Sequence, residues 1–268
     1  MSYSWKLAAL LACTIVAGSP ILAQETAPTS AISEDLIVPR YVVAVLGSNM
    51  SYLEQGTGDA VVFLHGNPTA AYLWRNVIPY VSETHRAIAP DLIGMGHSDK
   101  PEIDYTFADH AAYLDAFIVE LGLTEITLVA HDWGAALAWD FAQRHPDTVV
   151  KLAFMEGVLP PAFPQASYEA MGPQMGGMFK ALQDEEIGYQ MIMEDNMFVD
   201  GILPQMMLRP LGETATAEYG APYETVESRL PTWMWPREVP IGGQPETNVT
   251  LMEDILEFMD KTDMPVLL

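Results

Sequence analysis

The chain has 268 residues, half of them hydrophobic, which suffices for one large domain with an inserted lid. Its formal charge of −24 excludes partners that bind through phosphate contacts, because such a surface repels nucleic acid and anionic membranes. The charge also disfavours an anionic substrate, so a neutral small molecule fits better. An adaptation to keep the protein in solution, in salty surroundings for example, explains the same charge equally well.

Residues 1–23 have the pattern of a secretory signal peptide. Lys6 supplies a positive n-region, an apolar stretch follows, and Ile21-Leu22-Ala23 forms a small-residue cleavage site. A membrane anchor is the alternative, but the apolar stretch is too short for a full span and Pro20 interrupts it. We therefore expect export to the periplasm or the medium, with no stable membrane association after cleavage. Cleavage would remove Cys13, the one cysteine, so the mature domain would contain no disulfide.

Residues 24–158 alternate between short apolar segments typical of strands and segments with helical apolar spacing. This alternation predicts an α/β core with a mainly parallel sheet flanked by helices. Strands are expected at residues 41–46, 50–53, 60–64, 86–89, 126–130 and 149–155. Helices are expected at residues 72–81, 107–121 and 135–144.

The composition changes at residue 159, where a proline-rich run breaks the alternation. Eight methionines follow between residues 171 and 207, without a convincing strand, which predicts an inserted helical cap over 159–240. Because methionine is flexible and polarizable, the cap would suit an adaptable apolar cavity, although ordinary helix packing explains the methionines equally well. Residues 241–268 are expected to return to the core through a helix at 248–261 and the start of a strand at 265–268.

The chemistry of the core centres on Asp132, which lies where a strand of small and β-branched residues turns sharply into a helix. Ala130 and Gly134 leave room for the bend, so the segment has the pattern of a nucleophile elbow with aspartate in place of serine. A carboxylate is already ionised at neutral pH, so it can attack without a base to activate it. The alternative role for Asp132 is a helix N-cap.

Trp133 follows the aspartate directly, and its indole N–H is only a donor. Such a donor beside a nucleophile suits a leaving group that departs as an anion, because it stabilises charge that develops in the transition state. Asn67, in the segment His65-Gly66-Asn67-Pro68, offers a second neutral donor. Taken alone, Trp133 would be read as a core residue and Asn67 as a turn residue before proline.

The motifs taken together resemble haloalkane dehalogenases of the α/β-hydrolase fold, from about residue 38 to the end of the chain. Two of the motifs, His65-Gly66-Asn67-Pro68-Thr69 and Asp109-His110, are shared with epoxide hydrolases, but the whole series in order is specific. The residues that carry the resemblance are His65-Gly66-Asn67-Pro68-Thr69, Tyr72-Leu73-Trp74-Arg75, Ala89-Pro90-Asp91-Leu92-Ile93-Gly94-Met95-Gly96, Asp109-His110, His131-Asp132-Trp133-Gly134 and Met155-Glu156.

The resemblance implies a hydrolase that cleaves carbon–halogen bonds of neutral haloalkanes to alcohol and halide, with water as cosubstrate and neither metal nor organic cofactor. Asp132 would be the nucleophile and form an alkyl-enzyme ester. Asn67 and Trp133 would bind the halide through their side chains and form the oxyanion hole through their backbone N–H groups. Glu156, at the end of an apolar strand, would orient the catalytic histidine; the alternatives are an acid after the next strand and a merely exposed carboxylate.

In the family the catalytic base is a histidine after the last strand, whereas the last histidine of this chain is His145. We therefore expect that the C-terminal strands and helix are missing, through a fragmentary record or a truncated gene, and that the unfinished sheet exposes an aggregation-prone edge. Such a chain would stop after releasing one halide per Asp132. His65 is expected to make structural hydrogen bonds, and His131 not to act as the base. The remaining histidines are expected at the surface or in loops: His85, His97, His110 and His145.

Three alternatives remain at this point. An epoxide hydrolase would need acidic phenols above the nucleophile, and the predicted cap offers Tyr168, Tyr189, Tyr219 and Tyr223. Asn67 after His-Gly argues against that reaction. A luciferase-like relative shares much of the pattern, without positive support. A catalytically dead remnant or small-molecule binder is suggested by the missing histidine.

Overall fold

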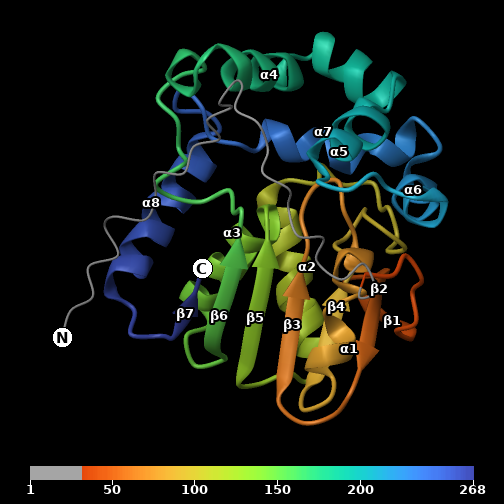
Figure 1. Cartoon of the computed structure of the whole chain (residues 1–268). Coiled ribbons are helices and arrows are strands. Elements are labelled where there is room, and N and C mark those ends of the chain that lie inside the picture. The colour runs from red at the N-terminus through yellow and green to blue at the C-terminus, as the bar shows by residue number, and fades with distance from the viewer. Residues whose placement is uncertain (1–31) are drawn as a thin grey trace, which may run out of the picture. The chain divides into compact units, whose positions relative to one another are not determined.

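The computed structural model describes residues 32–268, so the predicted signal peptide at 1–23 lies outside the described residues. The described chain contains a seven-stranded sheet in the order β1-β2-β4-β3-β5-β6-β7 (Figure 1). Antiparallel pairing joins β1, β2 and β4, and every pairing from β4 through β3 to β7 is parallel. The predicted mainly parallel α/β sheet is therefore confirmed. The strands are β1 (Arg40–Val45), β2 (Ser48–Gln55), β3 (Ala60–Leu64), β4 (Arg86–Pro90), β5 (Ile126–His131), β6 (Val149–Met155) and β7 (Val266–Leu267).

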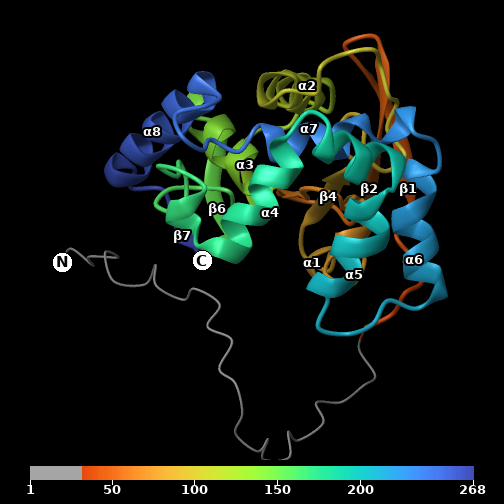
Figure 2. The ribbon, with the colours of Figure 1, turned by 90° about the horizontal axis from the view of Figure 1, so that it is seen from above.

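Helices cover both faces of the sheet, as Figure 2 shows from above. The apolar sides of α2 (Phe107–Glu120), α3 (Trp133–Arg144) and α8 (Glu246–Lys261) share one buried cluster with strand residues such as Leu128. On the opposite face, the 3₁₀ helix η1 (Ala71–Trp74) and the short α1 (Ile78–Val81) pack in a second apolar cluster. This layering places β3 and β5 at the centre of the core, with their carboxyl ends at one edge of the sheet.

The single helix predicted at residues 72–81 is wrong, because the structure divides it into η1 and α1. Pro79 explains the interruption. It has no backbone N–H to donate to the carbonyl of Arg75, and in a continuous helix its ring would clash with that carbonyl. Pro79 lies instead in the first turn of α1, where helices tolerate proline.

The segment between β6 and α8 consists of short helices that lie across the carboxyl ends of the parallel strands (Figure 1). We keep the name cap for residues 159–240, whose exact bounds stay a prediction. Four of its methionines are substantially exposed and so do not line an enclosed cavity: Met175, Met178, Met197 and Met206. The elements are η2 (Glu169–Met171), α4 (Pro173–Gln183), η3 (Tyr189–Glu194), η4 (Phe198–Ile202), α5 (Leu203–Met206), α6 (Glu213–Gly220), η5 (Ala221–Tyr223), η6 (Glu227–Arg229) and α7 (Leu230–Arg237).

Glu34, in the segment that precedes β1, joins the cap to the core. Its carboxylate accepts hydrogen bonds from the backbone N–H groups of Gly212, at 2.6 Å, and Ala215, at 3.3 Å, where α6 begins. Its backbone carbonyl accepts a hydrogen bond from the hydroxyl of Tyr72 in η1. Glu34 thus satisfies N–H groups at the start of a cap helix that otherwise have no partner within the helix.

β7 is the last strand of the sheet, at the end opposite β1, and it pairs in parallel with β6. Val266 and Leu267 of β7 are 44% and 71% exposed. An exposed apolar edge strand is a surface on which another chain can pair. Within residues 32–268, no helix combines the length and the apolar character needed to cross a membrane.

Candidate active site

The turn between β5 and α3 has the backbone geometry of a nucleophile elbow. Asp132 occupies it with φ of 55° and ψ of −128°, in the left-handed half of the backbone map that non-glycine residues rarely adopt. Gly134 lets α3 start close to β3, because a Cβ there would lie 2.5 Å from the carbonyl oxygen of His65. Asp132 stands at the N-cap position of α3, as the alternative role has it, but its side chain makes no capping hydrogen bond, so capping does not explain the carboxylate.

The Asp132 carboxylate is held by one of its two oxygens. Oδ1 accepts the backbone N–H of Asn67 at 2.7 Å, and the backbone N–H of Trp133 faces the carboxyl group and lowers its pKa. Gly66 allows this approach, because a Cβ at that position would lie 2.0 Å from Oδ1. In the described part of the chain no donor reaches Oδ2. The carboxylate therefore has one fixed oxygen and one free oxygen.

Burial and neighbouring groups have opposite effects on the pKa of Asp132. Burial raises the pKa of the carboxyl group, whereas the hydrogen bonds from Trp133 and Asn67 and the nearby His131 lower it; burial prevails. An anion that has lost part of its hydration is raised in free energy. Nucleophilic attack converts the carboxylate into a neutral ester and so removes the partly desolvated charge. The surroundings of Asp132 therefore favour this attack.

Trp133 and Asn67 lie beside the carboxylate as the sequence predicts. Trp133 is 2% exposed and stacks on Trp235 of α7, with ring centroids 4.8 Å apart. Its indole N–H donates to no residue of the described chain. The Nδ2 of Asn67 donates to the carbonyl oxygen of Thr232, also in α7, at 3.1 Å. That contact uses one of the two amide hydrogens and fixes the amide, which leaves the second hydrogen for a ligand.

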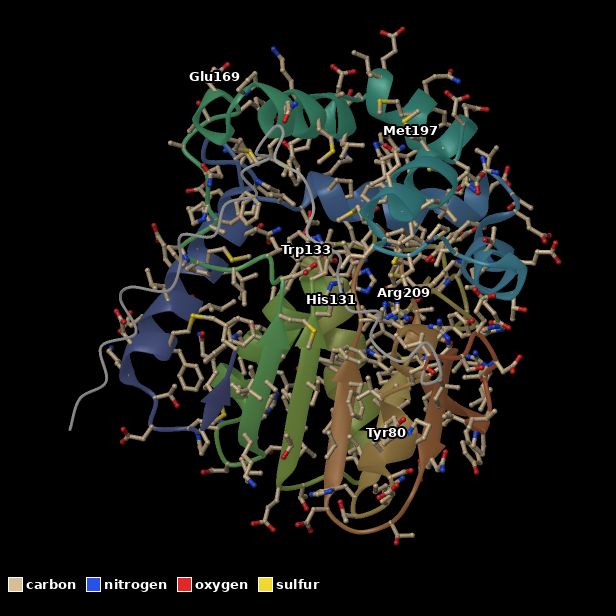
Figure 3. All side chains as sticks on the ribbon, viewed as in Figure 1. Tyr80, His131, Trp133, Glu169, Met197 and Arg209 are labelled. Atoms are coloured by element: carbon tan, nitrogen blue, oxygen red, sulfur yellow. The ribbon has the colours of Figure 1, made fainter. Side chains whose placement is uncertain are left out.

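Glu156 follows β6 at the same edge of the sheet, with φ of 50°. Its Oε2 lies 3.6 Å from Nε2 of His131, and its side chain is 79% exposed. Figure 3 shows His131 and Trp133 at the carboxyl ends of the central strands, beneath the cap helices. The sequence had not suggested the contact between His131 and Glu156, which arises because β5 and β6 are neighbours. The predicted role of Glu156 as the acid partner of a histidine stays a prediction.

His65 makes structural hydrogen bonds, as predicted. Its ring is fully buried, and Nε2 accepts the backbone N–H of Leu92 at 2.9 Å. Nδ1, at 2.9 Å from the carbonyl oxygen of Gly66, then carries the proton and donates it to that oxygen. Burial lowers the pKa of His65, which keeps the ring neutral and the loop before Asn67 in place.

The expectation that His110 lies at the surface is wrong. His110 is 1% exposed and its ring stacks on that of Trp235. The helical spacing explains the burial, because His110 lies three residues after Phe107 and four before Leu114, two buried residues of α2. Thr106 and Asp109 form a capping box that starts the helix at Phe107 and so fixes this face.

The tyrosines of the cap do not form the acid pair that epoxide opening requires. The hydroxyl of Tyr168 donates to Gln183, and Tyr189 is 39% exposed. Tyr219 and Tyr223 are buried, and burial raises the pKa of both phenols, which makes them weaker acids. No hydrogen bond joins any of the four to Asp132 in the described structure.

Sequence reasoning did not identify three residues of the site. Gly66 is signalled by its place before Asn67, but only the approach of Asp132 shows why a side chain cannot stand there. Thr232 and Trp235 come from α7, about 100 residues after the elbow, and local pattern does not place them. Two surface hollows, of about 370 and 540 Å³, are lined by other residues than Asp132, Asn67 and Trp133.

Comparison with known proteins agrees with this geometry. Residues 59–198 match the family model described as the alpha/beta hydrolase fold. The chain is 48% identical over 207 residues to a haloalkane dehalogenase of Mesorhizobium japonicum, covering 77% of this chain and 66% of that protein. It is 40% identical over 232 residues to a haloalkane dehalogenase of Sphingobium indicum, covering 84% of this chain and 76% of that protein.

The three-dimensional comparison gives the same family. The crystal structure of a haloalkane dehalogenase from Bradyrhizobium elkani superposes with a TM-score of 0.80 at 43% identity, covering 85% of this chain and 79% of that chain. The chain therefore spans about two thirds to four fifths of the length of the relatives it matches. At these identities and coverages, the protein belongs to the haloalkane dehalogenase family of the α/β-hydrolase fold.

Proposed function

We propose that the protein hydrolyses carbon–halogen bonds of neutral haloalkanes, using Asp132 as nucleophile and releasing halide and alcohol. The observation that carries this proposal is the orientation of the Asp132 carboxylate. Oδ1 accepts the N–H of Asn67 while Oδ2 has no described donor, so Oδ2 is the oxygen that attacks. The neutral donors beside it suit a leaving group that acquires negative charge.

In the first step, the electron pair of Oδ2 forms a bond to the carbon while the carbon–halogen bond breaks and its electron pair leaves with the halide. The indole N–H of Trp133 and the free amide hydrogen of Asn67 stabilise the departing anion. Each donor is expected to lower the barrier by about 2–4 kcal/mol, by analogy with oxyanion-hole donors. Neither donor adds a cation, so the halide is stabilised without a charge that would retain it.

In the second step, water attacks the ester carbonyl carbon and gives a proton to a general base, and Oδ1 acquires negative charge. The bond between that carbon and Oδ2 then breaks, Oδ2 leaves with the alkyl group and takes up a proton to become the alcohol, and the oxygen from water completes the new carboxylate. The backbone N–H groups of Asn67 and Trp133 already face the carboxylate and form the oxyanion hole for this intermediate. Attack by water needs a general base. By the family resemblance, Glu156 would orient a histidine that serves as this base. We propose that role for Glu156, although none of the six histidines of this chain is expected to be that base, so the first step is the one that this chain is expected to complete.

The first step is tested with the full chain and 1-bromobutane. Bromide release is titrated while intact-mass spectrometry follows the protein. We expect at least one bromide per Asp132, together with a mass increase of one butyl group in any protein that has not yet turned over. Asp132→Asn is the matched control, since it keeps the shape and removes the nucleophile. Equal bromide release from Asp132→Asn would contradict the assignment.

Glu156→Gln separates the two steps. We expect this variant to release the first bromide at the same rate, because only the second step needs an oriented base. The ester is expected to persist in the parent protein as well, so the role of Glu156 is measured by the rate at which the ester is lost, and a slower loss in Glu156→Gln than in the parent protein would support it. A slowed first bromide would instead place Glu156 among the groups that act on the nucleophile.

We also propose that the protein is exported, on the signal-like pattern of residues 1–23. Removal of Lys6 and of no acidic residue would change the formal charge from −24 to −25. Such a surface suits a neutral haloalkane as substrate and disfavours nucleic acid and anionic membranes. N-terminal sequencing of the protein recovered outside the cytoplasm tests the proposal. A mature chain that still begins at Met1 would contradict it.

A further inference from the structure

Three aromatic side chains form a buried stack behind the proposed halide site. The ring of His110 lies 4.1 Å from that of Trp235 with an interplanar angle of 21°, and Trp235 lies 4.8 Å from Trp133 with an angle of 29°. Their exposures are 1%, 0% and 2%. We call these residues the aromatic stack. Trp235 is the ring that both of the others contact, so it links α2 to the first residue of α3.

His110 is a polar residue at a position where an apolar side chain would pack. Both ring nitrogens are buried, and neither has a hydrogen-bond partner in the described chain. Leaving buried polar atoms without partners is destabilising. Burial lowers the pKa of His110 to about 3, so the ring is neutral at physiological pH. What the position retains is therefore a flat neutral ring, in contact with Trp235 by its face.

Trp235 is fixed at its edge as well as at its face. Its Nε1 donates to Sδ of Met95, in the loop after β4, at 3.2 Å. Phe107, one turn before His110 in α2, also approaches Trp133, with centroids 6.0 Å apart. α2 therefore contributes to the plane of the Trp133 indole both directly and through Trp235. A hydrogen-bond donor is effective only when its N–H points at the acceptor.

We propose that His110 is a positioning residue for the halide donor, acting through Trp235 to hold the indole plane of Trp133. This inference rests on the proposed function, in which Trp133 donates to the departing halide. His110 touches neither substrate nor halide in this account. Its flat shape lets Trp235 stack closely, and its neutrality leaves the halide to directional donors alone.

The test measures bromide binding to the full chain by saturable quenching of tryptophan fluorescence, with near-UV circular dichroism as a second measurement of the stack. His110→Leu keeps an apolar side chain but removes the flat ring. We expect the bromide dissociation constant to rise by roughly twofold to tenfold, the equivalent of one aromatic stacking contact. We expect the tryptophan dichroism bands to weaken in parallel. His110→Phe restores a ring without nitrogens and should recover both measurements.

Two controls separate this role from general packing. His145→Leu removes a histidine that also contacts an aromatic ring, that of Phe141, with centroids 4.4 Å apart. This pair lies outside the aromatic stack, so the variant should leave bromide binding unchanged. Trp133→Phe should abolish the saturable quenching and so identify its source. If His110→Leu does not fold, His110→Met replaces it with the same expectation, because methionine fills a similar volume without a flat ring.

The outcomes are distinguishable. Parent-like bromide binding in a folded His110→Leu or His110→Met variant overturns the positioning role and leaves the proposed function intact. Failure of His110→Phe to recover binding overturns the flat-ring explanation. Absence of saturable bromide quenching in the parent protein overturns the proposed halide site and this inference together.

Discussion

Replacement of Asp132 by asparagine is expected to stabilise the protein while abolishing halide release. The side chains have the same shape, and Oδ1 of asparagine can still accept the N–H of Asn67 that the carboxylate accepts at 2.7 Å. The substitution removes only a partly desolvated charge, whose burial raises the pKa of the group. Active sites commonly contain such local destabilisation, and its removal typically gives about 0.5–2 kcal/mol. Because Asp132 is half-buried, we expect the lower part of that range.

The sign of the pH dependence follows from the raised pKa. Between the ordinary pKa of aspartate and the raised value, folded Asp132 binds more protons than the unfolded chain, so the stability of the parent protein decreases as the pH rises through this window. Asp132→Asn has no such titration. The difference in stability should therefore be near zero in acid and grow as the pH rises through the window.

Thermal melting at a series of pH values measures the effect. For a chain of this size, 1 kcal/mol shifts the melting temperature by about 2–4 °C, so we expect Asp132→Asn to melt about 1–4 °C above the parent at pH 7.5. Asp91→Asn is the matched control, a buried aspartate that accepts from Arg40 at 2.6 Å and from the backbone N–H of Ala71 at 2.8 Å. Asp91→Asn should lower the unfolding free energy by about 1–3 kcal/mol, because it removes a hydrogen-bonded buried carboxylate. A melting temperature for Asp132→Asn below that of the parent at pH 7.5 would refute the reasoning, because it would mean that the hydrogen bonds to the carboxylate outweigh its desolvation.

Three further predictions concern the elbow and the cap. Trp133→Phe should slow single-turnover alkylation of Asp132 by about 10²-fold or more. The control Trp139→Phe removes another buried indole N–H of α3 and should leave that rate near the parent value. Equal alkylation rates in the two variants would show that Trp133 does not act at the halide site. In chemical denaturation, Gly134→Ala should lower the unfolding free energy by about 1–3 kcal/mol, because the new Cβ would lie 2.5 Å from a backbone oxygen. The control Gly177→Ala in α4 should be neutral or stabilising, because a Cβ there meets nothing within 4 Å. Glu34→Ala should cost about 0.5–2 kcal/mol and speed hydrogen exchange in α6, and unchanged exchange there would show that Glu34 does not hold the cap.

The elbow was predictable from the sequence because its determinants are local. A strand of small and β-branched residues, an aspartate and a glycine two positions later leave few other backbone paths, and the structure has the strand, turn and helix there. The same holds for the buried strand β3 and for α2, whose predicted bounds differ from the observed ones by at most one residue. Pro79 is a local signal too, because a proline divides a helix, and it divides the predicted helix at residues 72–81.

The rest of the site depends on contacts between distant segments. Asn67 donates to Thr232, which lies 165 residues further along the chain, and the spacing of either residue alone says nothing about the other. His110 was misplaced for a related reason. A histidine is usually polar surface, and only the helical register with Phe107 and the arrival of Trp235 from the cap make it a buried ring.

The contact of Glu34 with α6 has a consequence for attaching the protein to a surface. A tether on the N-terminal side of residue 34 would pull on Glu34, whose carboxylate binds the start of α6 in the cap and whose backbone carbonyl binds Tyr72. Tension applied there would therefore act on the cap. A tether on the solvent side of α8, at Glu257 for instance, loads a helix that packs on the opposite flank of the sheet. Immobilised sensors that are joined through the two positions should therefore differ in activity, with the N-terminal attachment the more sensitive to load.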